Sequence, residues 1–254
     1  MHRSFRGLTP AALAMATMLA LPAAAQGARA LPFAPGDECV YRGSAVLGRI
    51  GTGVMAVDGP ERVDGRSVYL LRFDFRGRVG PAAVEDHTRS WFDPEELASV
   101  RYTKRERSPI SSRAQDVRMD AAARRWSSAA GGGAMSTAAP LDELSFLYFI
   151  RTLPLEPGAT YTLARHYEAR RNPVVVRVVG RGPVRVPAGQ FDAVQLLMRV
   201  KDPARYGGEG VIRLHLTDDA RRILLRIESS VPGAGRMVLS LESGRGGCAV
   251  GAGH

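Results

Sequence analysis

The chain alternates apolar and polar residues with a period of two, and this alternation limits its fold more than any other feature. The clearest example runs from Pro183 to Val200, PVRVPAGQFDAVQLLMRV, where a PAGQ turn separates two alternating runs. In the second run, Val194, Leu196 and Met198 share one face. Alternation on both sides of a turn predicts an antiparallel hairpin with one buried face.

Similar patterns recur along most of the chain. They predict strands in residues 38–57, 67–77, 87–107, 160–168, 174–180, 210–228 and 237–242, with a turn at 58–65 and a further short strand pair around 119–126. No internal repeat of the solenoid type is present. We therefore predict a mainly β protein. It has a single large antiparallel, strongly curved sheet, or a partly open barrel, with one main helix packed on it.

The one convincing helix is predicted from Leu141 to Leu153. Asp142 is a suitable N-cap residue, and Pro154 ends the helix. The apolar residues of this segment fit a period of 3.6 and form a stripe that can pack on the sheet.

The composition divides the chain into one domain and its extensions. Residues 26–37 read as a leader, 38–248 as a single β-rich domain, and 249–254 as a tail. Between 127 and 140 the sequence falls to Ser, Ala and Gly, which predicts a flexible, low-complexity loop.

The first 25 residues have the pattern of a secretory signal peptide. Arg3 and Arg6 precede an apolar run from Leu8 to Leu21, and three alanines offer a cleavage site. No later apolar stretch reaches membrane-spanning length. We expect a periplasmic or secreted protein with no transmembrane segment after cleavage. Its oligomeric state is left open.

The charge of +10 at pH 7 invites a nucleic-acid interpretation, which other features oppose. The basic residues are almost all arginines, dispersed along alternating strands without a patch of interleaved aromatics. Export also argues against a nucleic-acid partner. Weak attraction to an anionic envelope surface stays open as an alternative.

Two cysteines remain in the mature chain, Cys39 near its start and Cys248 near its end. In an oxidising compartment an even number of cysteines predicts a disulfide. This one would tie the first strand to the tail of the last.

Motifs for catalysis or metal binding are lacking. The mature histidines are scattered, and no HExxH, CxxC or GxSxG sequence is present. The pair Asp86–His87 is better explained as a solvated turn followed by an outward strand residue, and Asp218–Asp219 as turn formers. We therefore predict no catalytic residue, no cofactor and no metal ligand, and expect that the protein is not an enzyme.

Five phrases together resemble a bacterial exported family known as domain of unknown function 3108. They are GDECVYRGSAVLGRIGTG, WFDPEELASVRYTKRE, LDELSFLYFIRTLPLEPG, VPAGQFDAVQL and LTDDARRILLRIES, which occur in that family's order. The resemblance covers most of the mature chain. It implies an exported β-rich domain and carries over no activity.

The function expected from these features is non-catalytic binding of an apolar or lipid-like ligand, or of an envelope component. A curved sheet with a helix against its concave side can enclose such a ligand. The residues predicted to line the site are Tyr69, Phe73, Trp91, Met198 and Tyr148. One alternative is a periplasmic interaction or assembly module without a small ligand, which binds through a sheet edge or an Arg-rich outer face. A second is an envelope hydrolase whose site the sequence does not reveal.

Overall fold

A computed structural model describes residues 30–251, except 47, 110 and 233–234. The predicted signal peptide at 1–25 lies outside the described residues. The elements, in chain order, are β1 (Glu38–Ala45), β2 (Gly48–Val63), β3 (Arg66–Val79), β4 (Ala82–Asp93), β5 (Ala98–Ser108), β6 (Ser111–Asp120), β7 (Arg125–Ser128), β8 (Gly131–Ala134), α1 (Glu143–Phe149), η1 (Ile150–Thr152), β9 (Thr160–Leu163), η2 (Ala169–Arg171), β10 (Val174–Val186), β11 (Gly189–Asp202), α2 (Pro203–Tyr206), β12 (Gly208–Thr217), β13 (Leu224–Val231), β14 (Gly235–Arg245) and η3 (Gly246–Cys248).

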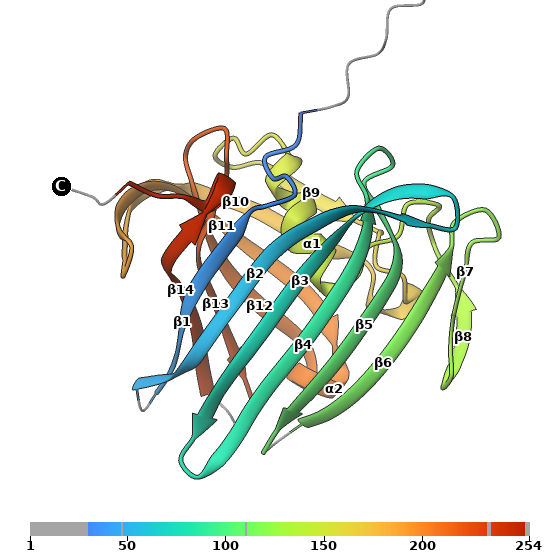
Figure 1. The fold of residues 1–254 in the computed structure, drawn as a ribbon, viewed down its shortest axis with the longest axis horizontal. Coiled ribbons are helices and arrows are strands. Elements are labelled where there is room, and N and C mark those ends of the chain that lie inside the picture. The colour runs from blue at the N-terminus through green and yellow to red at the C-terminus, as the bar shows by residue number, and fades with distance from the viewer. Residues whose placement is uncertain (1–29, 47, 110, 233–234, 252–254) are drawn as a thin grey trace, which may run out of the picture.

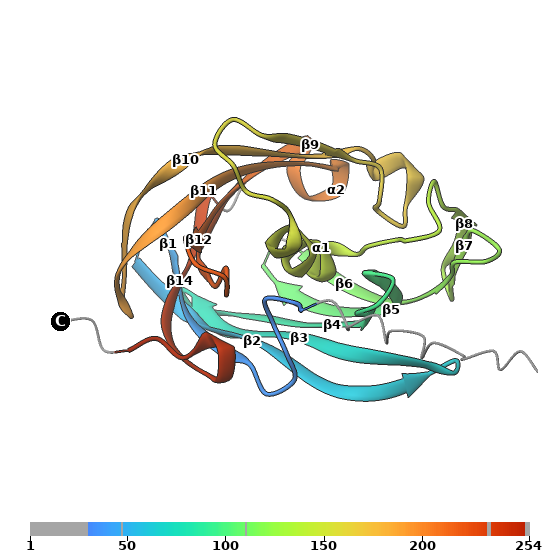
Figure 2. The same cartoon turned by 90° about the horizontal axis from the view of Figure 1, so that it is seen from above.

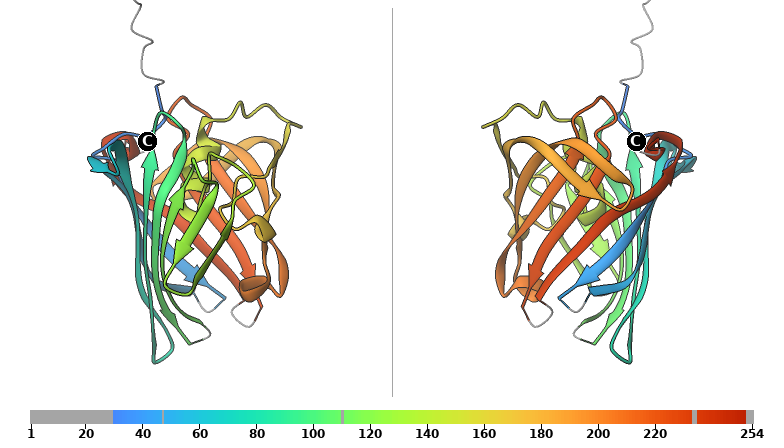
Figure 3. Two further views of the ribbon diagram at one scale, coloured as in Figure 1. Left: turned by 90° about the vertical axis from the view of Figure 1, so that its right-hand side faces the viewer. Right: turned by 90° about the vertical axis from the view of Figure 1, so that its left-hand side faces the viewer.

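All fourteen strands form one antiparallel sheet, as the alternation predicted. Its order is β8-β7-β6-β5-β4-β3-β2-β1-β14-β13-β12-β11-β10-β9, so every hydrogen-bonded pair is consecutive in the chain except β1 with β14. The sheet curls round into a barrel-like shape whose two walls face each other (Figures 1 and 3). It does not close, because its two ends, β8 and β9, are not paired with each other. We call the gap between these end strands the seam.

The predicted hairpin is present as β10 and β11, with Val186 opposite Gly189 across the turn. Val194, Leu196 and Met198 are buried, and they contribute to the main hydrophobic core. Residues 58–63 continue strand β2 through an irregularity in its pairing with β3, although their sequence predicted a turn. The strand predicted at 160–168 stops at Leu163.

The main helix lies inside the curl of the sheet (Figure 2). As predicted, Asp142 caps it: the carboxylate accepts hydrogen bonds from the backbone N–H groups of Leu144 and Ser145, both at 2.9 Å. The serine hydroxyl accepts in return from the backbone N–H of Asp142, which completes a capping box. Strand β4 supports this cap, since the Ser90 hydroxyl donates to the Asp142 carboxylate at 2.5 Å. The helical region is shorter than predicted: α1 ends at Phe149 and a 3₁₀ turn follows to Thr152.

The prediction of a flexible loop at 127–140 was wrong for its first half. Residues 125–128 and 131–134 pair as the hairpin β7–β8, at one end of the sheet. The glycines are suited to this hairpin: a Cβ at Gly132 would lie 2.6 Å from the carbonyl oxygen of Trp126, and one at Gly133 would lie 3.0 Å from its indole nitrogen. A strand of glycines therefore forms because an indole and its backbone cover it.

The predicted leader at 26–37 also belongs partly to the domain. Phe33 is buried in the main core, with its ring 5.0 Å from that of Tyr148 in an edge-on arrangement. The side chain of Asp37 accepts a hydrogen bond from the backbone N–H of Gly247, so this segment also holds η3, the turn that follows β14. In the described part of the chain, no helix has the length and hydropathy to cross a membrane.

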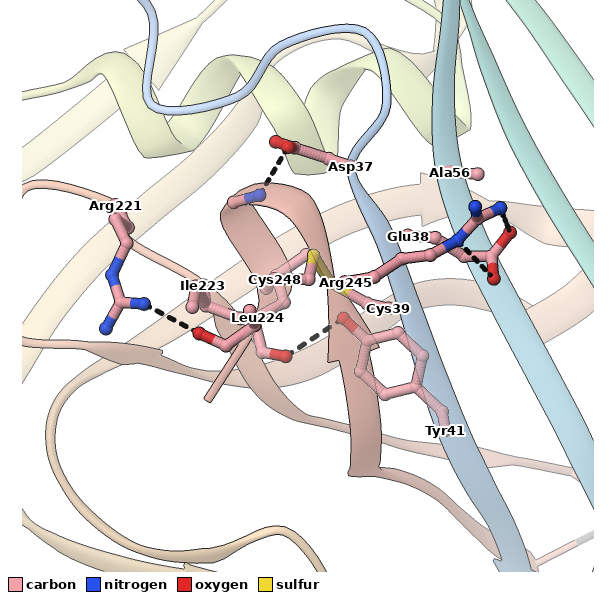
Figure 4. The surroundings of a disulfide bond; sticks show 12 residues. Asp37, Glu38, Cys39, Tyr41, Ala56, Arg221, Ile223, Leu224, Arg245 and Cys248 are labelled. Carbon is pink, nitrogen blue, oxygen red and sulfur yellow. Dashed lines mark hydrogen bonds and ion pairs between the residues drawn. A yellow bond between two sulfur atoms is a disulfide. The ribbon is translucent and has the colours of Figure 1, made fainter. Parts of the chain in front are cut away.

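The predicted disulfide joins Cys39 in β1 to Cys248 in η3 (Figure 4). Their Cα atoms lie 5.4 Å apart, and both residues are buried. Beside the disulfide, the buried Tyr41 hydroxyl donates to the carbonyl oxygen of Leu224 at 2.9 Å. The bond links residues 209 positions apart in the sequence, so it closes nearly the whole domain into a loop.

Removing this disulfide should lower the free energy of unfolding by about 3–5 kcal/mol, because the unfolded chain regains the conformations that the closed loop excludes. The change is the double variant Cys39→Ala/Cys248→Ala, measured by urea unfolding with and without a reductant. The reductant should shift the midpoint of the wild-type protein and leave that of the variant unchanged. Equal midpoints for oxidised and reduced wild-type protein would contradict the prediction.

Candidate functional site

The inner surface of the curled sheet has two parts. Beneath α1 it is packed: Leu144, Phe146 and Ile150 are at most 4% exposed and belong to the main core. Other apolar side chains on the inner face pack against this core but stay half-buried, so they keep contact with solvent. We call these the inner apolar patch; its members are Phe73, Val200, Ile212, Ile227 and Leu239.

Strand register makes the patch continuous. Leu239 of β14 lies opposite Ile227 of β13. Ile212 of β12 is the diagonal neighbour of Ile227 and lies opposite the buried Met198 of β11. Directly opposed and diagonal residues on one face of a sheet are close enough to touch. The members of the patch therefore lie on five strands, β3, β14, β13, β12 and β11, and none of them is charged.

Glycines keep the neighbouring part of this wall smooth. A Cβ on Gly43 would come within 2.4 Å of the ring of Phe75, and a Cβ on Gly51 within 2.8 Å, so the ring lies flat over the two strands. A Cβ on Gly53 would meet Phe73 at 3.3 Å and Leu239 at 3.6 Å. Larger residues at these positions would displace the aromatic rings into the interior.

The five residues predicted to line a ligand site do not come together. Tyr69 and Phe73 lie on the inner face of β3 and are half-buried. Met198 and Tyr148 are each 3% exposed within the main core and cannot face a ligand there. Trp91 lies on the outer face of β4, where Arg101 stacks over its ring at 4.8 Å. Tyr69, Phe73 and Met198 alternate inward as the strand pattern indicated, but the pattern showed neither the outward position of Trp91 nor the depth at which Met198 is buried.

The sequence also missed a cluster of buried charges near the seam. Lys104 of β5 is 4% exposed although it is charged. Its ammonium nitrogen lies 2.9 Å from Asp86, 3.4 Å from Glu106 and 3.5 Å from Glu143 at the start of α1. The inner face of β4 and β5 therefore changes from apolar to charged toward this end.

The charges continue across the seam. Arg171 of η2 binds Glu143 at 2.8 Å and Asp202 of β11 at 3.0 Å. Arg113 of β6 lies 3.6 Å from the same Asp202, and so joins β6 near one end of the sheet to β11 near the other. We call these seven residues the seam network: Asp86, Lys104, Glu106, Arg113, Glu143, Arg171 and Asp202. The only sequence signal for it is the presence of polar residues at inward positions of alternating strands.

Lys104 and Glu143 of the seam network are held in their charged states. Burial opposes the charge of Lys104, but the three carboxylates outweigh burial and raise its pKa. Burial likewise opposes the charge of Glu143, yet Lys104 and Arg171 hold the pKa of this carboxyl well below its usual range. General acid–base catalysis needs a group that titrates near the working pH. Lys104 and Glu143 are instead suited to holding the structure together.

The three mature histidines that the structure describes lie apart. His87 is on the outer face of β4, with Nδ1 2.6 Å from Asp74, while Asp86 beside it points inward to Lys104. His215 is on β12, and His166 is buried next to α1. Among the described residues, no group of three or more His, Cys, Asp or Glu side chains is arranged to hold a metal ion. Asp219 accepts hydrogen bonds within its own turn, as predicted.

His166 occupies an apolar position. Its ring stacks on Tyr167 with centroids 4.7 Å apart, and on Phe146 at 6.3 Å. Nδ1 accepts a hydrogen bond from the backbone N–H of Glu168 at 3.0 Å, so the proton of the neutral ring lies on Nε2, which has no partner within the described structure. Burial, with a smaller contribution from Arg171, lowers the pKa of His166 to about 3.

Comparison with known proteins identifies a family and a fold. The model of a family described as "Protein of unknown function (DUF3108)" matches residues 40–241. Among solved structures, a β-barrel-like protein of the domain of unknown function DUF1849 from Brucella abortus is similar, with a TM-score of 0.54 and 11% identity over 84% of this chain and 97% of that chain. At this identity the likeness concerns the fold alone. No curated protein matches the sequence.

Two further structures are more distant. One is a protein described as exported, with a YmcC-like fold, from Bacteroides fragilis; its TM-score is 0.37 at 11% identity, over 85% of this chain and 98% of that chain. The other is a protein described as a lipoprotein from Parabacteroides distasonis, with a TM-score of 0.35 at 12% identity and the same coverage. These scores are too low to support an argument about this chain.

The substitution Lys104→Met should lower the free energy of unfolding by about 3–5 kcal/mol, because it leaves buried carboxylates without their common partner. The chain's other lysine provides the control: Lys201 is exposed, and Lys201→Met should change stability by at most about 0.5 kcal/mol. Urea unfolding of both variants measures the difference. Similar midpoints for the two would show that the seam network contributes little to stability.

The substitution His166→Gln should weaken the pH dependence of stability. An unfolded histidine gains a proton near pH 6.5, whereas the folded state excludes that proton until about pH 3. His166 therefore favours unfolding increasingly as the pH falls below 6.5, by up to about 1.4 kcal/mol per pH unit. Urea unfolding at pH 7, 6 and 5 should give a smaller slope for the variant than for the wild-type protein. Parallel slopes would argue against a neutral buried imidazole.

Proposed function

Since this chain belongs to the DUF3108 family of proteins of unknown function, as its five motifs predicted, no activity comes with the family, and we propose a function from the site itself. The protein is an exported, non-catalytic binding protein of the cell envelope that takes up a lipid-like ligand on the inner face of its curled sheet. The observation that carries the proposal is the inner apolar patch, five half-buried apolar side chains on the inner face of the sheet.

The patch favours an apolar ligand for a physical reason. Its side chains keep part of their surface in water, and covering apolar surface stabilises a complex by about 25 cal/mol for each Å² removed from water. The wall beside it is smooth, since the ring of Phe75 lies over Gly43 and Gly51. An acyl chain could lie along this wall without displacing the core beneath α1.

Export is supported by two features. The first is the signal-peptide pattern of residues 1–25, and the second is the disulfide between Cys39 and Cys248, a bond that persists in oxidising compartments. A non-catalytic role agrees with the seam network, whose buried lysine and Glu143 have pKa values displaced away from neutrality. The geometry offers no support for the hydrolase alternative.

The binding of a fluorescent polyene fatty acid, cis-parinaric acid, tests the proposal. We expect the wild-type protein to bind it and Leu239→Glu to bind it at least about tenfold more weakly, because the substitution places a charge within an apolar contact. Leu197→Glu is the matched control, since Leu197 is also half-buried but lies on the outer face of β11. This control should bind the probe within about twofold of the wild-type affinity.

Mass spectrometry of solvent extracts gives a second measurement. Protein purified after export should carry a co-purified lipid, and Leu239→Glu should carry less of it. Equal binding by the two leucine variants would contradict the location of the site. No bound probe and no extracted lipid would favour the alternative, an interaction module without a small ligand.

A further inference from the structure

The outer face of β3–β6 carries an array of arginines that the proposed function does not use. Strand register places them in rows across the sheet: Arg76 lies in a row with Arg107, with Glu85 between them, and Arg72 lies in a row with Arg89. In the next row, Trp91, Arg101 and Arg118 lie side by side. We call this surface the outer arginine face; its arginines are Arg72, Arg76, Arg89, Arg101, Arg105, Arg107 and Arg118.

The charges on this face are unbalanced. Arg72 binds Asp58 and Asp74, Arg89 binds Asp74, and Arg101 binds Asp116 at 2.6 Å. The remaining arginines form no ion pair with any residue that the structure describes, and all of them are exposed: Arg76, Arg105, Arg107 and Arg118. Exposed guanidinium groups without an internal partner are available to bind anions from outside.

The shape of the face decides what kind of anion fits. It is hollowed by two open depressions, one of about 490 Å³ and the other of about 330 Å³, and both are bordered by His87 and Arg89. Neither encloses a small molecule, and the unpaired arginines are spread over three strands. An extended partner that presents many anionic groups side by side suits this arrangement better than one small ligand.

We propose that the outer arginine face docks the protein onto a phospholipid surface that contains anionic headgroups. A planar guanidinium can bind a phosphate through two parallel hydrogen bonds. Trp91, with Arg101 stacked over its ring at 4.8 Å, supplies at the edge of the face an aromatic side chain of the kind that favours the headgroup region. The inference goes beyond the proposed ligand site and does not depend on it, since the two lie on opposite faces of the sheet.

Vesicle co-sedimentation tests docking. The probes are two kinds of vesicle. One contains phosphatidylcholine alone, and in the other about one lipid in three is the anionic lipid phosphatidylglycerol. We expect binding to the anionic vesicles alone, with an affinity that falls as NaCl is raised, because salt screens exposed charges.

Two triple variants locate the contact. Arg105→Gln/Arg107→Gln/Arg118→Gln should reduce the affinity about 100-fold, since each basic residue near an anionic membrane contributes about fivefold. The matched control is Arg177→Gln/Arg199→Gln/Arg213→Gln on the outer face of β10–β12, the opposite wall in Figure 3. These three arginines are also exposed, and they form no ion pair with another described residue. The control removes the same charge and should keep the affinity within about threefold.

Three outcomes would overturn the inference. An equal loss in both triple variants would mean that net charge, not this face, attracts the vesicles. Equal binding to vesicles of phosphatidylcholine alone would remove the role of anionic headgroups. Binding to soluble polyglutamate without binding to vesicles would point instead to an acidic protein partner. Because the substituted arginines are exposed, an unchanged circular dichroism spectrum is expected for both variants and confirms that they are folded.

Discussion

The open seam between β8 and β9 is the constraint on which the rest of this structure depends. A closed barrel satisfies its edge strands with backbone hydrogen bonds, but this sheet leaves its two ends unpaired. Side chains join the walls instead. Arg113 on β6 and Arg171 in η2 both contact Asp202 on β11, and Arg171 extends the connection to Glu143 on the helix. Buried ion pairs add little net stability over apolar packing, but breaking one is costly. The seam network therefore specifies how the walls meet more than it strengthens them.

The helix inside the curled sheet contacts polar residues at its N-terminus and apolar residues along its stripe. Its first residue, Glu143, takes part in the seam network, and its N-cap Asp142 is held by the Ser90 hydroxyl from the inner face of β4. The wall that receives the helix terminus is consequently polar, while the wall under its apolar stripe is packed. Elsewhere on the inner face, the members of the inner apolar patch pack against the core but stay half-buried.

Sequence reasoning recovered the parts of this fold that depend on local pattern. Alternation located the β10–β11 hairpin, Asp142 marked the helix start, and the two cysteines predicted the disulfide. It failed where a residue's role depends on elements far away in the chain. Met198 and Phe73 both alternate inward, but alternation does not show that the first is buried in the core and the second keeps solvent contact.

Sequence reasoning also failed to predict which charged residues point into the fold. A charged residue between polar neighbours is ordinarily assigned to the solvent face, yet Lys104 points inward and its neighbour Arg105 outward. The hairpin β7–β8 escaped prediction because Gly132 and Gly133 have no side chains with which to alternate. Their suitability for a strand appears only with Trp126 in place. In both cases the missing information was a contact made across the fold.

Charged side chains have different surroundings on the two faces of strands β4 and β5. On the inner face, Lys104 is surrounded by carboxylates at 2.9 to 3.5 Å, and its charge is neutralised within the fold. On the outer face of β5, Arg105 and Arg107 are exposed and form no ion pair with a described residue. An exposed, unpaired arginine contributes little to stability, so folding alone does not account for an array of them. The inner charges are explained by the seam that they close, and the proposed contact with anionic headgroups would employ the outer ones.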